Sequence, residues 1–420
     1  MNAKVSEIDN LSALLENEHL HTNSTLGQPF YCSNELLQVD LSKVFSRHWI
    51  LAGHISRLPR DGQYFLFQAG QESLVVVREN ATTVNAFYNV CRHRGSRICL
   101  EDEGEVRNFV CPYHSWRYNL DGSLKFARSM PEDFDPADNG LIKCQVKLWH
   151  GLIFLHLGNA EDAPFEKIYA GFNPYVEQQG IAEAKTAARV NYPTAANWKL
   201  VVENFIECYH CNAAHPEYVS VHSKDKLLAF GAGQGSGPED AVKRYQKVQA
   251  AWETKARSMG HFCGLLQPDE SEFGIQQAGR FPINDDNWMS ETLDGKAACS
   301  RLMGAFKDYD GGQTAMSFNP FSYLLASNDY AIIFRFTPIE ATHTDVEITW
   351  LVHPEAEEGV DYDLDHMMYV WDITTRQDKT ITENNQAGVL SKAYRPGRYS
   401  ELEVRNKTFK QWYLNQLSAD

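Results

Sequence analysis

The 420-residue chain has few basic residues and no long hydrophobic run. Its 39 Lys and Arg stand against 55 Asp and Glu, which gives a formal net charge of −16. This balance argues against nucleic acid as a partner, because phosphates are bound through clusters of Lys and Arg. With no apolar window of ~18 residues and no basic start followed by an apolar stretch, neither a membrane span nor a secretory signal is expected. The sequence therefore predicts a cytoplasmic protein.

A disulfide framework is also not expected. The chain has nine cysteines, an odd number, and no secretory signal, whereas disulfide-rich proteins are mostly secreted. Hydrophobic residues make up 43% of the sequence, and at roughly 150 residues per domain the length predicts two or three globular domains. A cysteine with suitable neighbours is then a candidate for metal binding.

The texture of the sequence changes along the chain and predicts an α+β protein. Short apolar runs separated by turn signals such as Asp121-Gly122 indicate a small all-β domain. In the later part of the chain, apolar residues recur with helical spacing after Asn197 and form strand-like runs in 316–352. A polar, partly glycine-rich stretch within it is expected to be an insertion or a lid. The predicted divisions are an N-terminal arm (1–44), the β domain (45–160), a linker (161–190), and a second domain (191–420) containing the insertion (224–315).

Two short strings in the β domain combine cysteine with histidine. They are CRHRGS (91–96) and CPYHSW (111–116), and each contains one Cys and one His: Cys91 with His93, and Cys111 with His114. Structural zinc sites usually recruit ligands in pairs of one residue type. In a Rieske 2Fe-2S cluster, two thiolates hold one iron and two imidazoles hold the other, so mixed pairs suit it better. The spacing predicts a Rieske cluster, with structural zinc as the alternative.

A second set of candidate ligands lies between Asn197 and Pro216. Helical spacing would put Glu203, Glu207 and His210 on one face. His215 follows five residues after His210, and Pro216 disfavours helical geometry there. Two imidazoles with one carboxylate from elsewhere form the facial triad of non-haem Fe(II) oxygenases, which leaves positions open for O₂ and substrate.

Both sets resemble the motifs of the Rieske non-haem iron oxygenases, whose mononuclear-iron motif is similar to ENFIECYHCNAAH (203–215). The resemblance implies a fold with an N-terminal all-β Rieske domain and a catalytic domain, in which helices cover an antiparallel sheet (helix-grip, START-like). It implies that His210 and His215 ligate Fe(II). Glu207, usually Asp in this family, would bridge to the cluster of a neighbouring subunit. Asp378 is the best-aligned third ligand, with Asp372 and Asp329 as rivals.

The strings VVENFIECYHCNAAHPEY (201–218) and ENNQAGVLSKAYRPGRYS (383–400) look most like the glycine betaine, carnitine, stachydrine and choline oxygenases. The resemblance implies hydroxylation beside a quaternary nitrogen with loss of formaldehyde. It also implies electrons from NAD(P)H through a separate flavin/iron-sulfur reductase, and a homotrimer. The alternatives are an aromatic-ring dioxygenase component and a non-catalytic Rieske electron carrier.

A quaternary ammonium ion cannot donate hydrogen bonds and is best held over aromatic faces. The sequence offers several rings for such a cage near the predicted iron site or on the later strands and helix. The candidates are Phe205, Tyr209, Phe318, Phe321, Tyr323, Tyr330 and Trp371.

Overall fold

The computed structural model describes residues 11–231, 238–266, 276–284 and 288–419. The chain forms two compact units: a small unit, Ser46–Phe165, and a large unit made of the residues up to Phe45 and from Glu166 onward. The second division, at 165/166, falls within 161–190, the residues expected as a linker. The residues expected as a linker instead form α4 (Phe165–Tyr169), α5 (Asn173–Gln179) and the first part of β11 (Lys185–Thr194).

The small unit is built from β-strands, as the alternating runs predicted. One antiparallel sheet has the strand order β1-β10-β9-β4-β3-β2-β5, and a three-stranded sheet has the order β6-β7-β8. The Asp121-Gly122 turn joins β7 to β8, and Gly122 has a φ of +85°, which favours glycine. The strands are β1 (Ile50–His54), β2 (Gln63–Ala69), β3 (Glu72–Asn80), β4 (Thr83–Tyr88), β5 (Glu103–Glu105), β6 (Phe109–Val110), β7 (Arg117–Tyr118), β8 (Leu124–Phe126), β9 (Lys143–Trp149) and β10 (Leu152–His156).

The large unit contains a seven-stranded antiparallel sheet in the order β11-β17-β16-β15-β14-β13-β12. Its two last strands come from 224–315, the stretch expected to be an insertion or a lid. Residues 232–237, 267–275 and 285–287 of that expected insertion lie outside the described residues. The remaining strands of this sheet are β12 (Gly264–Leu266), β13 (Gln277–Pro282), β14 (Gly312–Asn319), β15 (Ser322–Ala326), β16 (Tyr330–Glu340) and β17 (His343–Val352).

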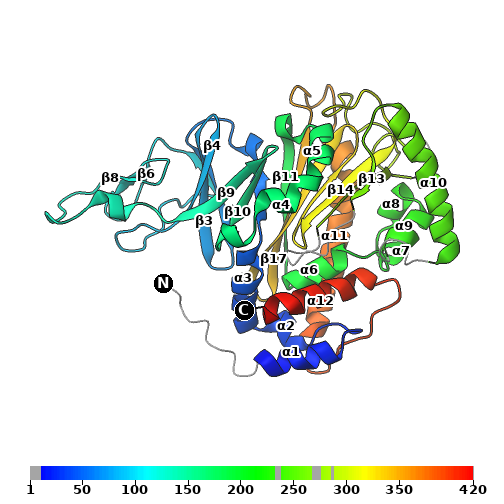
Figure 1. Ribbon diagram of the computed structural model, residues 1–420, viewed down its shortest axis with the longest axis horizontal. Helices are drawn as coiled ribbons and strands as arrows, with labels where there is room; N and C mark the ends of the chain where they lie inside the picture. The colour runs from blue at the N-terminus through cyan, green and yellow to red at the C-terminus, as the bar shows by residue number, and fades with distance from the viewer. Residues whose placement is uncertain (1–10, 232–237, 267–275, 285–287, 420) are drawn as a thin grey trace. The chain divides into compact units, whose positions relative to one another are not determined.

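Helices α6 (Trp198–Phe205) and α11 (Leu364–Val389) pack on one face of this sheet. Phe334 of β16 contacts both, with ring centroids 5.1 Å from Phe205 and 5.6 Å from Trp371. Figure 1 shows α11, in orange, running along the strands. The expected α+β fold with helices over an antiparallel sheet is confirmed.

The N-terminal arm is part of the large unit. Its helices α1 (Leu11–Leu20), α2 (Gln28–Cys32) and α3 (Asn34–Lys43) lie beside α12 (Val404–Ser418) in Figure 1. The buried carboxylate of Asp40 accepts hydrogen bonds from Lys199, Trp198 and Tyr413 at 2.5, 2.8 and 2.6 Å. Buried charges need such partners, so this network fixes the arm to α6 and α12.

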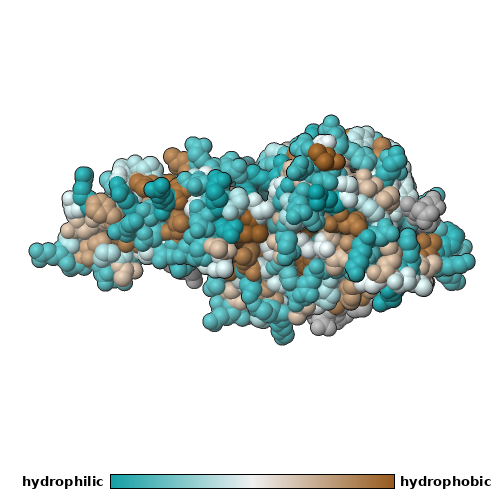
Figure 2. Space-filling view, turned by 90° about the horizontal axis from the view of Figure 1, so that it is seen from above, coloured by the Kyte–Doolittle hydropathy of each residue, from teal (hydrophilic) through white to brown (hydrophobic). Residues whose placement is uncertain are grey.

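The described helices show no membrane-spanning segment: none is long and apolar enough to cross a bilayer. Hydrophilic residues predominate on the face seen in Figure 2, where apolar residues form separate small patches. The remaining α-helices of the large unit are α7 (Cys211–Ala214), α8 (Pro216–Val221), α9 (Lys224–Gly231) and α10 (Glu239–Ser258).

Two candidate metal centres

The two Cys/His strings form a matched pair of loops in the small unit. The Cys91 N–H donates to the Ser96 carbonyl at 2.8 Å, and the Cys111 N–H donates to the Trp116 carbonyl at 2.9 Å. In each loop, the residue four positions after the cysteine has a positive φ: +74° at Gly95 and +61° at Ser115. The two loops therefore turn in the same way, and the residue at 95 is a glycine, which adopts a positive φ without steric cost.

The two candidate cluster histidines meet where these loops face each other. His93 Nδ1 and His114 Nδ1 lie 3.1 Å apart, close enough for both nitrogens to bind one metal ion. Cys91 and Cys111 are buried, only 2% and 1% exposed. Thiols on the inside and paired imidazoles on the outside fit a Rieske cluster.

Tyr118 is a residue of this site that the sequence analysis missed. Its buried hydroxyl accepts a hydrogen bond from the Arg92 N–H at 3.1 Å and lies 3.2 Å from Cys91 Sγ. Burial is the main cause that raises the pKa of Tyr118. The hydroxyl therefore stays protonated and can donate a hydrogen bond to Cys91 Sγ. Hydrogen bonds to cluster sulfurs are among the factors that set the reduction potential. The available signal was an aromatic residue on the strand that follows the second loop.

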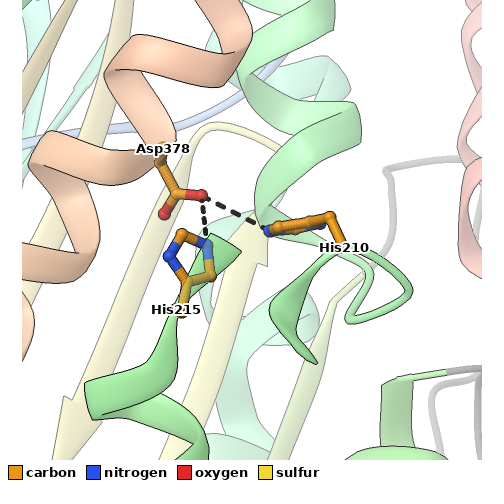
Figure 3. A group of neighbouring side chains, drawn as sticks. All are labelled: His210, His215 and Asp378. Atoms are coloured by element: carbon orange, nitrogen blue, oxygen red, sulfur yellow. Dashed lines mark hydrogen bonds and ion pairs between the residues drawn. The ribbon is translucent and has the colours of Figure 1, made fainter. Parts of the chain in front are cut away.

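The second centre lies in the large unit, where three segments meet. His210 directly precedes α7, His215 lies between α7 and α8, and Asp378 is on α11. Asp378 Oδ1 is 2.9 Å from His215 Nε2 and 3.4 Å from His210 Nε2, and the three ligand atoms lie within 4.8 Å of one another. Figure 3 shows the three side chains converging on one point. The structure therefore brings together the two imidazoles and the carboxylate of the predicted triad.

The two rival carboxylates are engaged elsewhere. Asp372 accepts from the Tyr192 hydroxyl at 2.6 Å and from Arg376 Nε at 2.8 Å. Asp329 is buried and accepts from Ser290 and from two backbone N–H groups. Of the three candidates, the one beside both imidazoles is Asp378.

The other nitrogen of each imidazole is held by an oxygen acceptor. His210 Nδ1 lies 2.5 Å from Glu207 Oε1, and His215 Nδ1 lies 2.9 Å from Gln377 Oε1. Gln377 in turn donates to Glu217 Oε2 at 2.8 Å. Such partners fix the ring orientation and leave Nε2 free for a metal, as is typical of metal-binding histidines.

The electrostatics of the triad favour a positive charge at its centre. Burial lowers the pKa of His210, but the carboxylates of Asp378 and Glu207 outweigh it and raise this pKa to about 10. Burial raises the pKa of Asp378, and its hydrogen bonds from both imidazoles more than reverse this and lower it. A divalent cation at this point would be stabilised by the same carboxylates that raise the pKa of His210. Together with the two-His-one-carboxylate donor set, this fits Fe(II).

One sequence-based expectation about this region is wrong. Glu203, Glu207 and His210 do not share a helical face, because α6 ends at Phe205. Glu203 instead points toward the arm, where it accepts from the Tyr31 hydroxyl at 2.9 and 3.0 Å. Only Glu207 of the two carboxylates contacts His210.

A cavity of about 210 Å³ opens beside the triad. A single water needs only ~10–15 Å³, so a small organic molecule fits. Of the seven expected cage residues, Phe205, Tyr323 and Trp371 line it. Tyr209 is 58% exposed, and the buried Tyr330 donates to the Glu291 carbonyl at 2.9 Å.

The remaining two expected rings, Phe318 and Phe321, do not line the cavity either. Phe321 stacks on Phe45, just after the arm, and Phe318 stacks on Phe172. The sequence analysis missed the lining residues Tyr218, Phe281 and Arg405. Of these, Tyr218 is the last residue of the string 201–218 quoted above, whereas the other two had no local signal.

The chain matches two known protein families. The Rieske [2Fe-2S] domain family matches residues 48–144, and the ring hydroxylating alpha subunit (catalytic domain) family matches residues 181–419. The chain therefore belongs to the Rieske non-haem iron monooxygenases, with a Rieske 2Fe-2S domain and a catalytic domain for non-haem iron.

A curated relative is the glycine betaine monooxygenase oxygenase subunit of Pseudomonas aeruginosa strain UCBPP-PA14. It is 38% identical over 398 residues, which cover 94% of this chain and 89% of the relative. The fold resembles that of a quaternary ammonium Rieske monooxygenase whose structure "reveals insights into carnitine oxidation by gut microbiota and inter-subunit electron transfer" (TM-score 0.69, 22% identity, 95% and 97% of the two chains). It also resembles naphthalene 1,2-dioxygenase (TM-score 0.63, 18% identity, 95% and 93%). Since both structures share the fold, the fold alone does not choose the substrate.

Proposed function

We propose that the protein is the oxygenase component of a monooxygenase for a small quaternary ammonium compound similar to glycine betaine. It hydroxylates an N-methyl or adjacent carbon, and N-demethylation releases formaldehyde. The supporting observation is the set of rings around the cavity beside the triad. Phe205 and Tyr323 lie with centroids 4.5 Å apart, and Tyr218 and Trp371 lie 5.7 Å apart. The 38% identical relative is a glycine betaine monooxygenase oxygenase subunit, and this similarity supports the same substrate class.

The residues around the cavity have separate roles in this reaction. His210, His215 and Asp378 would hold the iron, which when bound supplies the activation of O₂ for insertion into a C–H bond. The two ring pairs hold the permanent cation, which cannot donate hydrogen bonds and is attracted to aromatic faces. The apolar wall also excludes water, so that the C–H bond of a bound methyl group is the available reaction partner.

Glu207 is proposed to carry the contact between subunits. Its carboxylate accepts from His210 Nδ1 and from the Tyr209 N–H, and an ionised carboxylate has about four acceptor positions. One remaining position can accept a hydrogen bond from the His114 imidazole of a second copy of this chain. This arrangement requires an oligomer, which we propose to be a homotrimer, and a separate reductase that delivers electrons from NAD(P)H.

Two measurements test this function. The holoenzyme is supplied with a reductase, NADH and O₂, together with a panel of methylammonium compounds and arenes, and formaldehyde is measured. Glycine betaine or a close analogue is expected to release formaldehyde. If arenes are converted to cis-diols and no methylammonium compound yields formaldehyde, the proposed substrate class is refuted. Iron analysis is expected to give three irons per chain, whereas a Rieske electron carrier without the second centre would contain two.

A further inference from the structure

Arg405 is the one cavity-lining cation that lacks an acceptor in the described part of the chain. It is the second residue of α12, and its side chain lines the cavity beside the triad. Its electrostatic neighbours are Cys208, Tyr323 and Tyr218, and none of these is a carboxylate. Buried or partly buried charges are normally paired, so an unpaired guanidinium facing a cavity points to an anionic ligand group.

The nearest carboxylate along the chain does not neutralise Arg405. Glu403 lies two residues earlier and accepts from the Ser400 N–H at 2.6 Å. Glu403 is the N-cap residue of α12, but its side chain does not cap the helix, and the first turn of α12 contains no acidic residue. A helix N-terminus already favours negative charge, and the guanidinium adds to this preference.

Lys226, the other cation of the cavity wall, is fully occupied. Its Nζ lies 3.0 Å from the Ile283 carbonyl, 3.1 Å from Gln313 Oε1 and 2.9 Å from His222 Nδ1. It also lies 5.1 Å from the centroid of the Phe281 ring. An ammonium group has three N–H donors, so Lys226 has none left for a ligand, and the Phe281 face is already used by a cation.

We propose that Arg405 binds the carboxylate of the substrate and thereby selects betaines, which carry both a quaternary ammonium and a carboxylate, over choline-like alcohols and simple tetraalkylammonium ions. This inference rests on the proposed function, since the ring pairs must hold the cationic end. A guanidinium presents two parallel N–H donors to a carboxylate. Fixing that end of a short zwitterion limits where its equivalent N-methyl groups can lie relative to the triad, so Arg405 is both a specificity and a positioning residue.

The first test uses the unmodified holoenzyme and needs no variant. Equilibrium dialysis under anaerobic conditions measures Kd for glycine betaine, for its methyl ester and for choline. The ester keeps the quaternary ammonium but has lost the negative charge. Glycine betaine is expected to bind about 10- to 100-fold more tightly than the ester, the range that charge-assisted hydrogen bonds provide. Equal affinity for glycine betaine and its ester overturns the role of Arg405.

The second test uses three variants. Arg405→Gln is expected to weaken glycine betaine by about 10- to 100-fold and to leave the ester unchanged, whereas Arg405→Lys gives an intermediate loss because the fork is replaced by a point charge. Lys407→Gln is the matched control, because Lys407 is a cation on the same helix but does not line the cavity. This variant is expected to bind both ligands normally. Visible spectra and iron content show that each variant is intact.

The outcomes separate this inference from the proposed function. If the wild-type protein binds and demethylates no quaternary ammonium compound, the proposed function itself fails. If it demethylates glycine betaine but Arg405→Gln binds it normally, only the role of Arg405 is refuted. An equal loss of betaine and ester binding in Arg405→Gln would mean that Arg405 maintains the shape of the cavity, which also refutes the proposal. Should that variant not fold, the ester comparison and Arg405→Lys give the decision.

Discussion

His215 Nε2 and Asp378 Oδ1 lie 2.9 Å apart although 163 residues separate them in the chain. The contact joins the short segment between α7 and α8 to the middle of α11, and His210 lies against the same oxygen at 3.4 Å. A long helix packed on the sheet thus delivers the carboxylate to two imidazoles from another part of the chain. This contact is the basis for expecting that the triad binds one metal ion.

Removing this carboxylate is expected to empty one centre only. Asp378→Asn should lower the iron content from three to two per chain, because an amide is a much weaker iron ligand than a carboxylate. The visible spectrum of the Rieske cluster should be unchanged. Asp372→Asn, on the same helix but paired with Arg376 and Tyr192, serves as the control and should retain three irons. Full iron content in Asp378→Asn would remove Asp378 from the ligand set.

Replacing Glu207 is expected to interrupt electron delivery while both centres stay filled. In Glu207→Gln, the amide oxygen can still accept from His210 Nδ1, but the negative charge is lost. We expect normal iron content and a decrease of at least 100-fold in the rate at which the reduced cluster is oxidised by O₂ with substrate present, measured by stopped-flow absorbance. The exposed Glu401→Gln is the control. A wild-type rate in Glu207→Gln would exclude Glu207 from the path.

The candidate cluster ligands and the two candidate iron histidines could be selected from the sequence because their signals are local. Cys91 lies close in sequence to His93, and Cys111 lies close to His114. This spacing already restricts the kinds of metal site that the residues could form. Asp378 was identified only through a family resemblance, because no local pattern connects it with His215. Arg405 and Phe281 could not be predicted as cavity residues, since tertiary packing alone brings α12 and β13 to the cavity. Tyr330 has the right residue type, but its hydroxyl is held by Glu291.

The hydrogen bond from Tyr118 to the cluster cysteine is expected to raise the reduction potential. Tyr118→Phe removes it without changing the ring, and the potential should fall by about 40 mV, which corresponds to ~1 kcal/mol for a one-electron couple. A redox titration followed by circular dichroism or electron paramagnetic resonance measures the change. Tyr88→Phe removes a hydroxyl whose partner is the Leu157 carbonyl and should leave the potential unaltered. An equal potential in Tyr118→Phe and wild type would contradict this role.

Glu203 is expected to make stability depend on pH. Burial raises its pKa from 4.5 to about 7, although the hydrogen bond from Tyr31 opposes the shift. Because the folded protein holds this proton more tightly than the unfolded chain, the contribution is fully present below pH 4.5 and is lost as pH rises through 7, by about 3 kcal/mol. Glu203→Gln stays neutral, so its free energy of unfolding relative to wild type should increase between pH 5 and pH 8. Urea titrations that give parallel pH profiles for the two proteins would refute this assignment.

A single-turnover reaction tests the central claim most directly. The holoenzyme is reduced anaerobically, freed of excess reductant, and mixed with glycine betaine and O₂, so that no reductase is needed. The proposed function predicts formaldehyde and dimethylglycine in equal amounts, with oxidation of the cluster. Oxidation of the cluster with no formaldehyde from glycine betaine or any other methylammonium compound, while naphthalene yields a cis-diol, would contradict it.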